Sequence, residues 1–226
     1  FTSAVRNPTL TDQYLNLNVG PAILRGNLEG ADSLITVDSF IKWRDTQKAS
    51  SLEYFNVDPI RPEQAQSIEV GYRATLSNRL FLDVSAFSTF YKNFIGYRIG
   101  IDAPFNESGQ IENLSQIRVY RYAANSSNEV VSQGANLGVN FYYWKQHAFS
   151  FNYSFNKLLK KQEDDPIIPA FNTPLHKFNM GVNGRELWPN NAGNTWGYAL
   201  NYKWVDDYFW EGSPQFTGPV PGFTIL

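Results

Sequence analysis

Alternation of aromatic and polar residues is the dominant pattern of this chain. Between Phe149 and Phe155 every second residue is aromatic, and small or polar residues occupy the positions between them. Successive side chains of a β-strand point to opposite faces, so this pattern predicts a strand with two different environments. A soluble antiparallel sheet packed on a core explains it, and so does a membrane-spanning strand whose rings face lipid.

Further segments repeat this period of two. A short strand is also predicted at 117–123, extending the same sheet. The faces opposite the rings carry Asn, Gly, Ser, Lys and Gln, which suits a water-filled interior. The main predicted strands are 66–74, 80–99, 131–144, 148–157, 176–184 and 195–209.

Connections between these strands alternate between short and long. Transmembrane barrels have brief turns on one side of the membrane and large loops on the other, whereas soluble sandwiches use short connections more evenly. Rings also gather near strand ends, as they do at a membrane interface. The pattern therefore favours a membrane barrel. Short turns are predicted at 76–79, 145–147 and about 187–194, and long extracellular loops at about 7–64, 100–130, 158–175 and 207–222.

Composition excludes several other classes of protein. No run of 18 or more apolar residues occurs, so helical spans are not predicted, while the mean hydropathy of −0.37 is compatible with strands that are only half apolar. The net charge of −2, with no basic tract, leaves no electrostatic footprint for nucleic acid. The absence of cysteine and the presence of only two histidines argue against thiol chemistry and metal centres. No catalytic grouping stands out, so we predict no enzyme and no cofactor.

The number of strands indicates a partial barrel. About six full strands can be counted, and both ends of the chain have the character of incomplete strands. An open sheet in lipid would leave unpaired amides at both edges, each costing several kcal/mol. We therefore expect further strands from a longer protein.

Short phrases occur in a fixed order along the chain, beginning with Arg6-Asn7-Pro8, Gly26-Asn27 and Pro62-Glu63. Together they resemble the barrel of TonB-dependent outer-membrane receptors. The length of the 7–64 insert is similar to that of Bacteroidetes-type members. The phrases "NTPLHKFNMGV" (172–182) and "VPGFTIL" (220–226) resemble later parts of the same barrel. The earlier matching positions are Arg6-Asn7-Pro8, Gly26-Asn27, Pro62-Glu63, and Glu69 with Gly71 and Tyr72.

This resemblance implies an all-β, antiparallel transmembrane β-barrel segment, with residues 1–226 as the C-terminal portion of a 22-stranded barrel. It implies capture and import of a scarce solute, most often a ferric siderophore, with cobalamin or an oligosaccharide as alternatives, across the outer membrane of a Gram-negative bacterium. The implied partners are outer-membrane lipid, a plug domain, the remaining barrel strands and an inner-membrane TonB-type energy transducer. The plug and the energy-coupling box are expected outside these 226 residues.

Aromatic residues of the long loops are the candidate ligand contacts, although each could instead pack one loop on another. The rival hypothesis is a soluble all-β carbohydrate-binding module whose exposed rings stack on sugars. The acidic run at 163–166 lacks the alternating ligand spacing of a calcium loop, so no metal is predicted there. The candidates are Trp43, Tyr54, Phe55, Tyr97, Phe105, Phe171 and Trp210.

Overall fold

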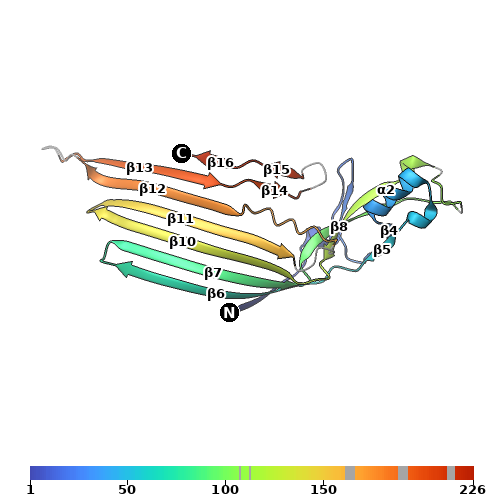
Figure 1. Ribbon diagram of the computed structural model, residues 1–226, viewed down its shortest axis with the longest axis horizontal. Helices are drawn as coiled ribbons and strands as arrows, with labels where there is room; N and C mark the ends of the chain where they lie inside the picture. Colours follow the sequence, from blue (N-terminus) through green and yellow to red (C-terminus); the bar gives the residue numbers. More distant parts are fainter. Residues whose placement is uncertain (107, 112, 161–165, 188–192, 213–216) are drawn as a thin grey trace.

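Eight antiparallel strands form one long curved sheet, here called the wall (Figure 1). The computed structural model describes residues 1–226 apart from 107, 112, 161–165, 188–192 and 213–216. The edge strands β1 and β16 do not pair with each other in the described chain, so the wall is an open section of a barrel. Its strands, in spatial order, are β1 (Thr2–Arg6), β6 (Glu63–Leu76), β7 (Leu80–Lys92), β10 (Val130–Trp144), β11 (His147–Lys160), β12 (His176–Leu187), β13 (Trp196–Val205) and β16 (Phe223–Ile225).

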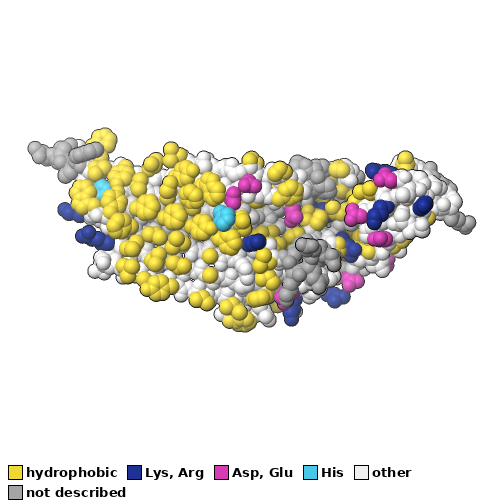
Figure 2. All heavy atoms as spheres, viewed as in Figure 1, with side chains coloured by type: hydrophobic (Ala, Val, Ile, Leu, Met, Phe, Trp, Pro, Cys, Tyr) yellow, Lys and Arg dark blue, Asp and Glu magenta, His cyan; other side chains and the backbone are white. Residues whose placement is uncertain are grey.

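The register of the wall separates apolar from polar side chains as the alternation predicts. One row of paired residues runs Val84, Leu137, Tyr153, Phe178 and Trp204 across five strands. Figure 2 shows this apolar face uncovered, with charged side chains gathered toward its two ends. Among the described residues no second sheet packs on these rings.

The opposite face of the wall is polar. The row next to Val84 contains Ser85, Asn136, Ser154 and Lys177. The three-residue turn between β6 and β7 has positive φ at Ser77 (51°) and Asn78 (52°), the geometry of a tight hairpin turn. The predicted short turns at 76–79 and 145–147 are confirmed, the second as the two residues between Trp144 and His147, and they lie at the same end of the wall. Most of the turn predicted at about 187–194 lies outside the described residues.

At the other end of the wall the chain builds a second sheet of six strands, β2-β3-β9-β8-β4-β5. Two helices and two short 3-10 turns accompany it, and no helix of the described residues has the length and apolar character needed to cross a bilayer. Its core contains Leu34, Val57, Tyr122, Ala124 and Ile167. A separate antiparallel pair is formed by β14 (Tyr208–Trp210) and β15 (Gly218–Val220). The elements of the second sheet and its surroundings are α1 (Leu10–Tyr14), β2 (Asn16–Asn18), β3 (Ile23–Arg25), β4 (Ala31–Ile35), α2 (Val37–Thr46), η1 (Ala49–Ser51), β5 (Tyr54–Val57), β8 (Ile95–Asp102), η2 (Leu114–Gln116) and β9 (Arg118–Asn125).

Three strand predictions need correction. The segment 195–209 is not one strand, because β13 ends at Val205 and β14 begins at Tyr208 and pairs with β15 outside the wall. The segment 80–99 is not one strand: β7 ends at Lys92, Asn93 adopts a left-handed conformation (φ 54°), and β8 leaves the wall. The strand predicted at 117–123 exists as β9, but it pairs with β8 and β3 in the second sheet and does not extend the wall. Alternation predicts a strand correctly but does not say which sheet it joins.

Candidate functional site

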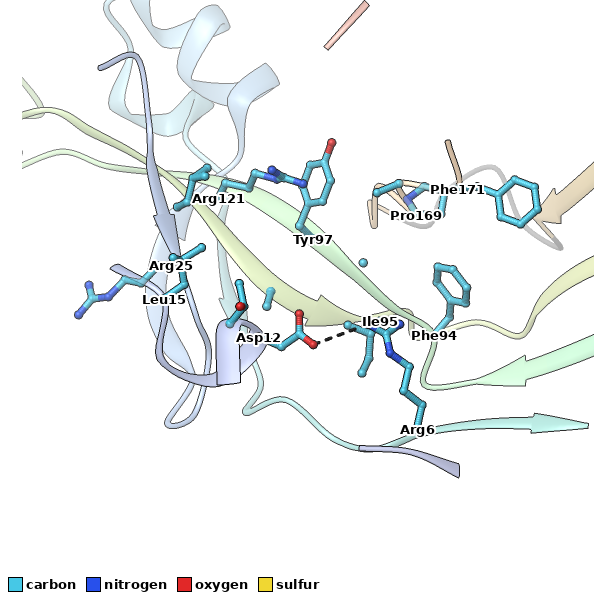
Figure 3. Close-up of a pocket in the computed structure, with 15 residues that line it drawn as sticks. Arg6, Asp12, Leu15, Arg25, Phe94, Ile95, Tyr97, Arg121, Pro169 and Phe171 are labelled. Carbon is cyan, nitrogen blue, oxygen red and sulfur yellow. Dashed lines mark ion pairs between the residues drawn. The ribbon is translucent and has the colours of Figure 1, made fainter. Parts of the chain in front are cut away.

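A cavity of about 380 Å³ lies where the wall meets the second sheet, and we call it the rim cavity (Figure 3). Its lining comes from β1, α1, β3, the start of β8, β9 and residues 169–171. By register, Arg6 of β1 pairs with Glu63 of β6, and Glu63 shares the polar face with Glu69 and Arg73. The rim cavity therefore stands at one end of the polar face of the wall.

Tyr97 and Arg121 form one side of the rim cavity. The guanidinium carbon of Arg121 lies 3.3 Å from the centre of the Tyr97 ring, a cation–π contact. Desolvation by burial raises the pKa of Tyr97 and lowers the pKa of Arg121, because burial disfavours the charged form of each group. The Nε atom of Arg121 is buried and has no hydrogen-bond partner among the described residues.

The backbone of Tyr97 ties two distant segments together. Its N–H donates to the Ile168 carbonyl at 3.1 Å, and the Ile168 N–H donates back at 2.9 Å. A Cβ atom at Gly96 would lie 2.4 Å from the Ile168 oxygen, so only glycine permits this close approach. Residues 169–171 are thereby held against β8.

Arg6 links α1 to the wall through two carboxylates. Its guanidinium nitrogens lie 3.7 Å from Asp12 and 3.7 Å from Glu63. Asp12 also accepts the Thr9 N–H at 2.9 Å as part of the α1 capping box. Glu63 is 5% exposed and accepts the Ile95 N–H at 2.8 Å, at the point where β8 leaves the wall. These contacts fix the floor of the rim cavity.

A third segment, leading from β14 to β15, reaches the same place. The Glu211 N–H donates to Asn172 Oδ1 at 2.6 Å, and Asn172 Nδ2 donates to the Glu211 carbonyl at 3.3 Å. Thr217 hydrogen-bonds the Tyr97 side chain, and the Glu211 carboxylate interacts electrostatically with both Tyr97 and Arg121. Three long connections of the sequence thus converge on Tyr97.

Only two of the seven candidate aromatic residues line the rim cavity, namely Tyr97 and Phe171. Trp43 is 4% exposed, stacks edge-to-face on Phe105 at 5.0 Å and donates its Nε1–H to the Gly109 carbonyl at 3.1 Å. These two rings pack α2 against the segment after β8, which is the alternative that the sequence left open.

The remaining three candidates lie outside the rim cavity. Phe55 carries the Arg98 guanidinium 3.6 Å from its ring centre, Tyr54 is 57% exposed on β5, and Trp210 is 41% exposed on β14. Sequence reasoning missed Arg6, Asp12 and Arg121, because it searched the loops for rings. Arg6 stands within the Arg-Asn-Pro phrase, which was a usable signal.

The polar face of the wall holds a second hollow of about 590 Å³. Asn136, Asn140 and Asn152 line it, and Arg73 Nε lies 2.8 Å from Asp83 Oδ2 within it. Amides and hydroxyls both donate and accept hydrogen bonds, so this surface can bind polar neutral groups. Within the described residues no group of three metal-ligating side chains occurs, and most of the acidic run 163–166 lies outside them.

The open antiparallel wall, apolar on one face and polar on the other, defines this chain as a section of a transmembrane β-barrel. The β-barrel model of TonB-dependent receptor-like proteins matches residues 1–226, and the chain belongs to that family. Members of this family are outer-membrane transporters of Gram-negative bacteria, with a plug domain and a TonB partner in general. The narrower Bacteroidetes-type assignment stays a prediction.

Among solved structures, the chain is similar to one titled "The FrpB iron transporter from Neisseria meningitidis (F3-3 variant)", with 15% sequence identity and a TM-score of 0.47. The similarity covers 74% of this chain and 24% of that one, so the chain spans about a quarter of the length of that transporter. A search of curated protein sequences finds no match.

Proposed function

We propose that this chain is the later part of the barrel of an outer-membrane transporter that captures a scarce solute, with a ferric siderophore as the substrate class. The observation that carries the proposal is the rim cavity, where the Arg121 guanidinium lies over the Tyr97 ring and where Phe171 and Arg6 are also lining residues. Concave sites lined by rings with a few polar groups are typical of ligand pockets.

Capture takes place in the segments 7–64, 100–130, 158–175 and 207–222, which we place outside the cell. The bound solute then passes along the polar face of the wall, whose amides exchange hydrogen bonds with it. The chain does no chemistry on the solute. A plug domain and an inner-membrane energy transducer, both expected from the family, supply gating and energy.

The rival carbohydrate-binding module predicts that the rings of the wall are packed away or face a sugar. Val70 is 73% exposed and Leu200 is 54% exposed on the apolar face, each near the middle of its strand. Lipid is the solvent that makes such exposure favourable.

The experiment is growth of a deletion strain under iron limitation, with each siderophore supplied in turn. We expect a growth defect that the wild-type gene restores. In the purified full-length receptor, Phe171→Ala should weaken binding of the active siderophore roughly tenfold, as loss of a contact ring does. Trp196→Ala, which removes an exposed ring of β13 outside the four capture segments, should leave the affinity unchanged. Normal growth of the deletion strain on every iron source would contradict the proposal.

A further inference from the structure

The positive charges at the rim cavity are already compensated. Arg6 is shared by Asp12 and Glu63, each 3.7 Å away, and Glu211 acts on Arg121. Two guanidinium groups therefore stand beside three carboxylates, which leaves no excess of positive charge to attract an anion.

Arg25 also lines the rim cavity, but its charge belongs to the other face of the second sheet. Its guanidinium carbon lies 5.6 Å from the Tyr120 ring centre and 5.8 Å from that of Tyr122, and Nη1 lies 3.3 Å from the Tyr122 hydroxyl. In Figure 3 its guanidinium points away from Tyr97 and Phe171. The aliphatic part of the Arg25 side chain therefore lines the cavity, while its charged guanidinium lies on the other face of the second sheet.

Burial makes an added charge unfavourable here. The guanidinium of Arg121 is already partly desolvated, and a charged ligand group brought beside it would lose water without gaining an unshared counter-ion. Apart from Thr11, the rest of the lining is apolar or aromatic, with Leu15, Leu24, Phe94 and Pro169 beside the two candidate rings. Such walls favour the uncharged faces of a ligand.

The hollow on the polar face has the same character. Its one arginine, Arg73, is paired with Asp83, and Glu69 adds a negative charge, while the other polar groups are amides and hydroxyls. Lys177 and Lys203 stand on β12 and β13, outside the lining of this hollow. A solute moving from the rim cavity along these strands meets hydrogen-bonding groups without a net positive surface.

We propose that the rim cavity binds an electrically neutral ligand, so that among iron chelates the receptor takes a neutral ferric hydroxamate in preference to an anionic ferric catecholate. This inference rests on the proposed function and narrows its substrate class. It also predicts that Glu211 restrains the affinity for anions, since its carboxylate offsets the charge of Arg121.

The test measures binding to the purified full-length receptor by quenching of tryptophan fluorescence. The probes are ferrichrome, a neutral hydroxamate, and ferric enterobactin, an anionic catecholate, together with maltohexaose and an oligogalacturonate as an iron-free neutral and anionic pair. We expect the neutral member of a pair to bind roughly tenfold more tightly, the size expected for one screened charge near a half-buried site.

A charge-removal variant sharpens the test. Glu211→Gln should shift the ratio of affinities toward the anionic probe by roughly tenfold. The control is Glu29→Gln, the same chemical change in a separate groove that Tyr120 and Tyr122 also line. It should leave the ratio of the two affinities unchanged.

The outcomes separate the two proposals. Tighter binding of ferric enterobactin than of ferrichrome overturns the neutral-ligand inference and leaves iron uptake standing. Binding of maltohexaose with neither chelate overturns the siderophore assignment and supports a neutral ligand. An unchanged ratio in Glu211→Gln, or binding of none of the four probes, counts against the inference.

Discussion

Replacing Val84 by lysine tests whether the apolar face of the wall lies in lipid. Val84 is 38% exposed on β7, and its cross-strand row continues through Leu137 and Tyr153. The next residue, Ser85, points to the polar face and lines the 590 Å³ hollow. The two positions are adjacent in sequence and differ in the solvent that they meet.

The structure places Val84 near the middle of the membrane. On β11 the apolar face extends from His147 to Lys157, which at about 3.3 Å per residue and a tilt of about 40° spans roughly 25 Å. That is about the height of the apolar band of outer-membrane barrels. Tyr153, in the row of Val84, lies within this band at roughly 15 Å from one border and 10 Å from the other. A lysine at such a depth costs about 2–4 kcal/mol.

The assay is urea unfolding of the full-length receptor in lipid vesicles, followed by tryptophan fluorescence. A loss of about 2–4 kcal/mol corresponds to a change of roughly 30- to 900-fold in the unfolding equilibrium. Ser85→Lys adds a side chain to a wet hollow and should cost less than about 1 kcal/mol. Equal costs at the two positions, or a larger cost at Ser85, would refute the assignment of the faces.

Three further perturbations test the second sheet. Glu63→Ala leaves the buried Ile95 N–H without its acceptor and should destabilise the folded receptor by about 1–3 kcal/mol, while Glu63→Gln should cost less; urea unfolding measures both. Trp43→Ala removes a buried ring and the donor to Gly109, and should lower the local stability around α2 by about 3–5 kcal/mol. Limited proteolysis measures this as faster cleavage around α2. Cleavage at the wild-type rate would contradict the packing role. Because the pKa of Tyr97 is raised above 10.0 in the folded state, the unfolded chain loses this proton first, so stability should fall as the pH rises above about 10. Tyr97→Phe should reduce that slope, and an identical slope would exclude the effect.

The faces of the wall could be predicted from sequence because each strand carries the information locally. Phe149, Phe151, Tyr153 and Phe155 alternate with Ser150, Asn152 and Ser154, and lipid on one side with water on the other requires that order at every strand. No knowledge of the neighbouring strands is needed. The short turn at 76–79 follows equally, since Asn78 tolerates positive φ.

The rim cavity could not be predicted in this way, because it depends on contacts between distant segments. Tyr97 bonds to Ile168, 71 residues further along the sequence (168 − 97), and Arg6 meets Glu63 only after the segment between β1 and β6 has folded. A search for rings finds Tyr97 but also finds Trp43, whose ring is used to pack α2. Aromatic type alone does not separate a packing residue from a ligand contact.

The position of the rim cavity nonetheless follows from where the one-sided pattern stops. Up to Lys92 one face of β7 meets lipid, so a ring or an ion pair that lines a cavity can lie only on its other face. After Asn93 that constraint ends, and β8 uses both faces: Gly96 and Arg98 on one, Tyr97 on the other. β9 does the same, with Tyr122 in the core of the second sheet and Arg121 at the cavity. A strand covered by protein on both faces can contribute to a core on one face and to a cavity on the other. The change from one-sided to two-sided alternation is therefore the sequence signal for where the rim cavity forms.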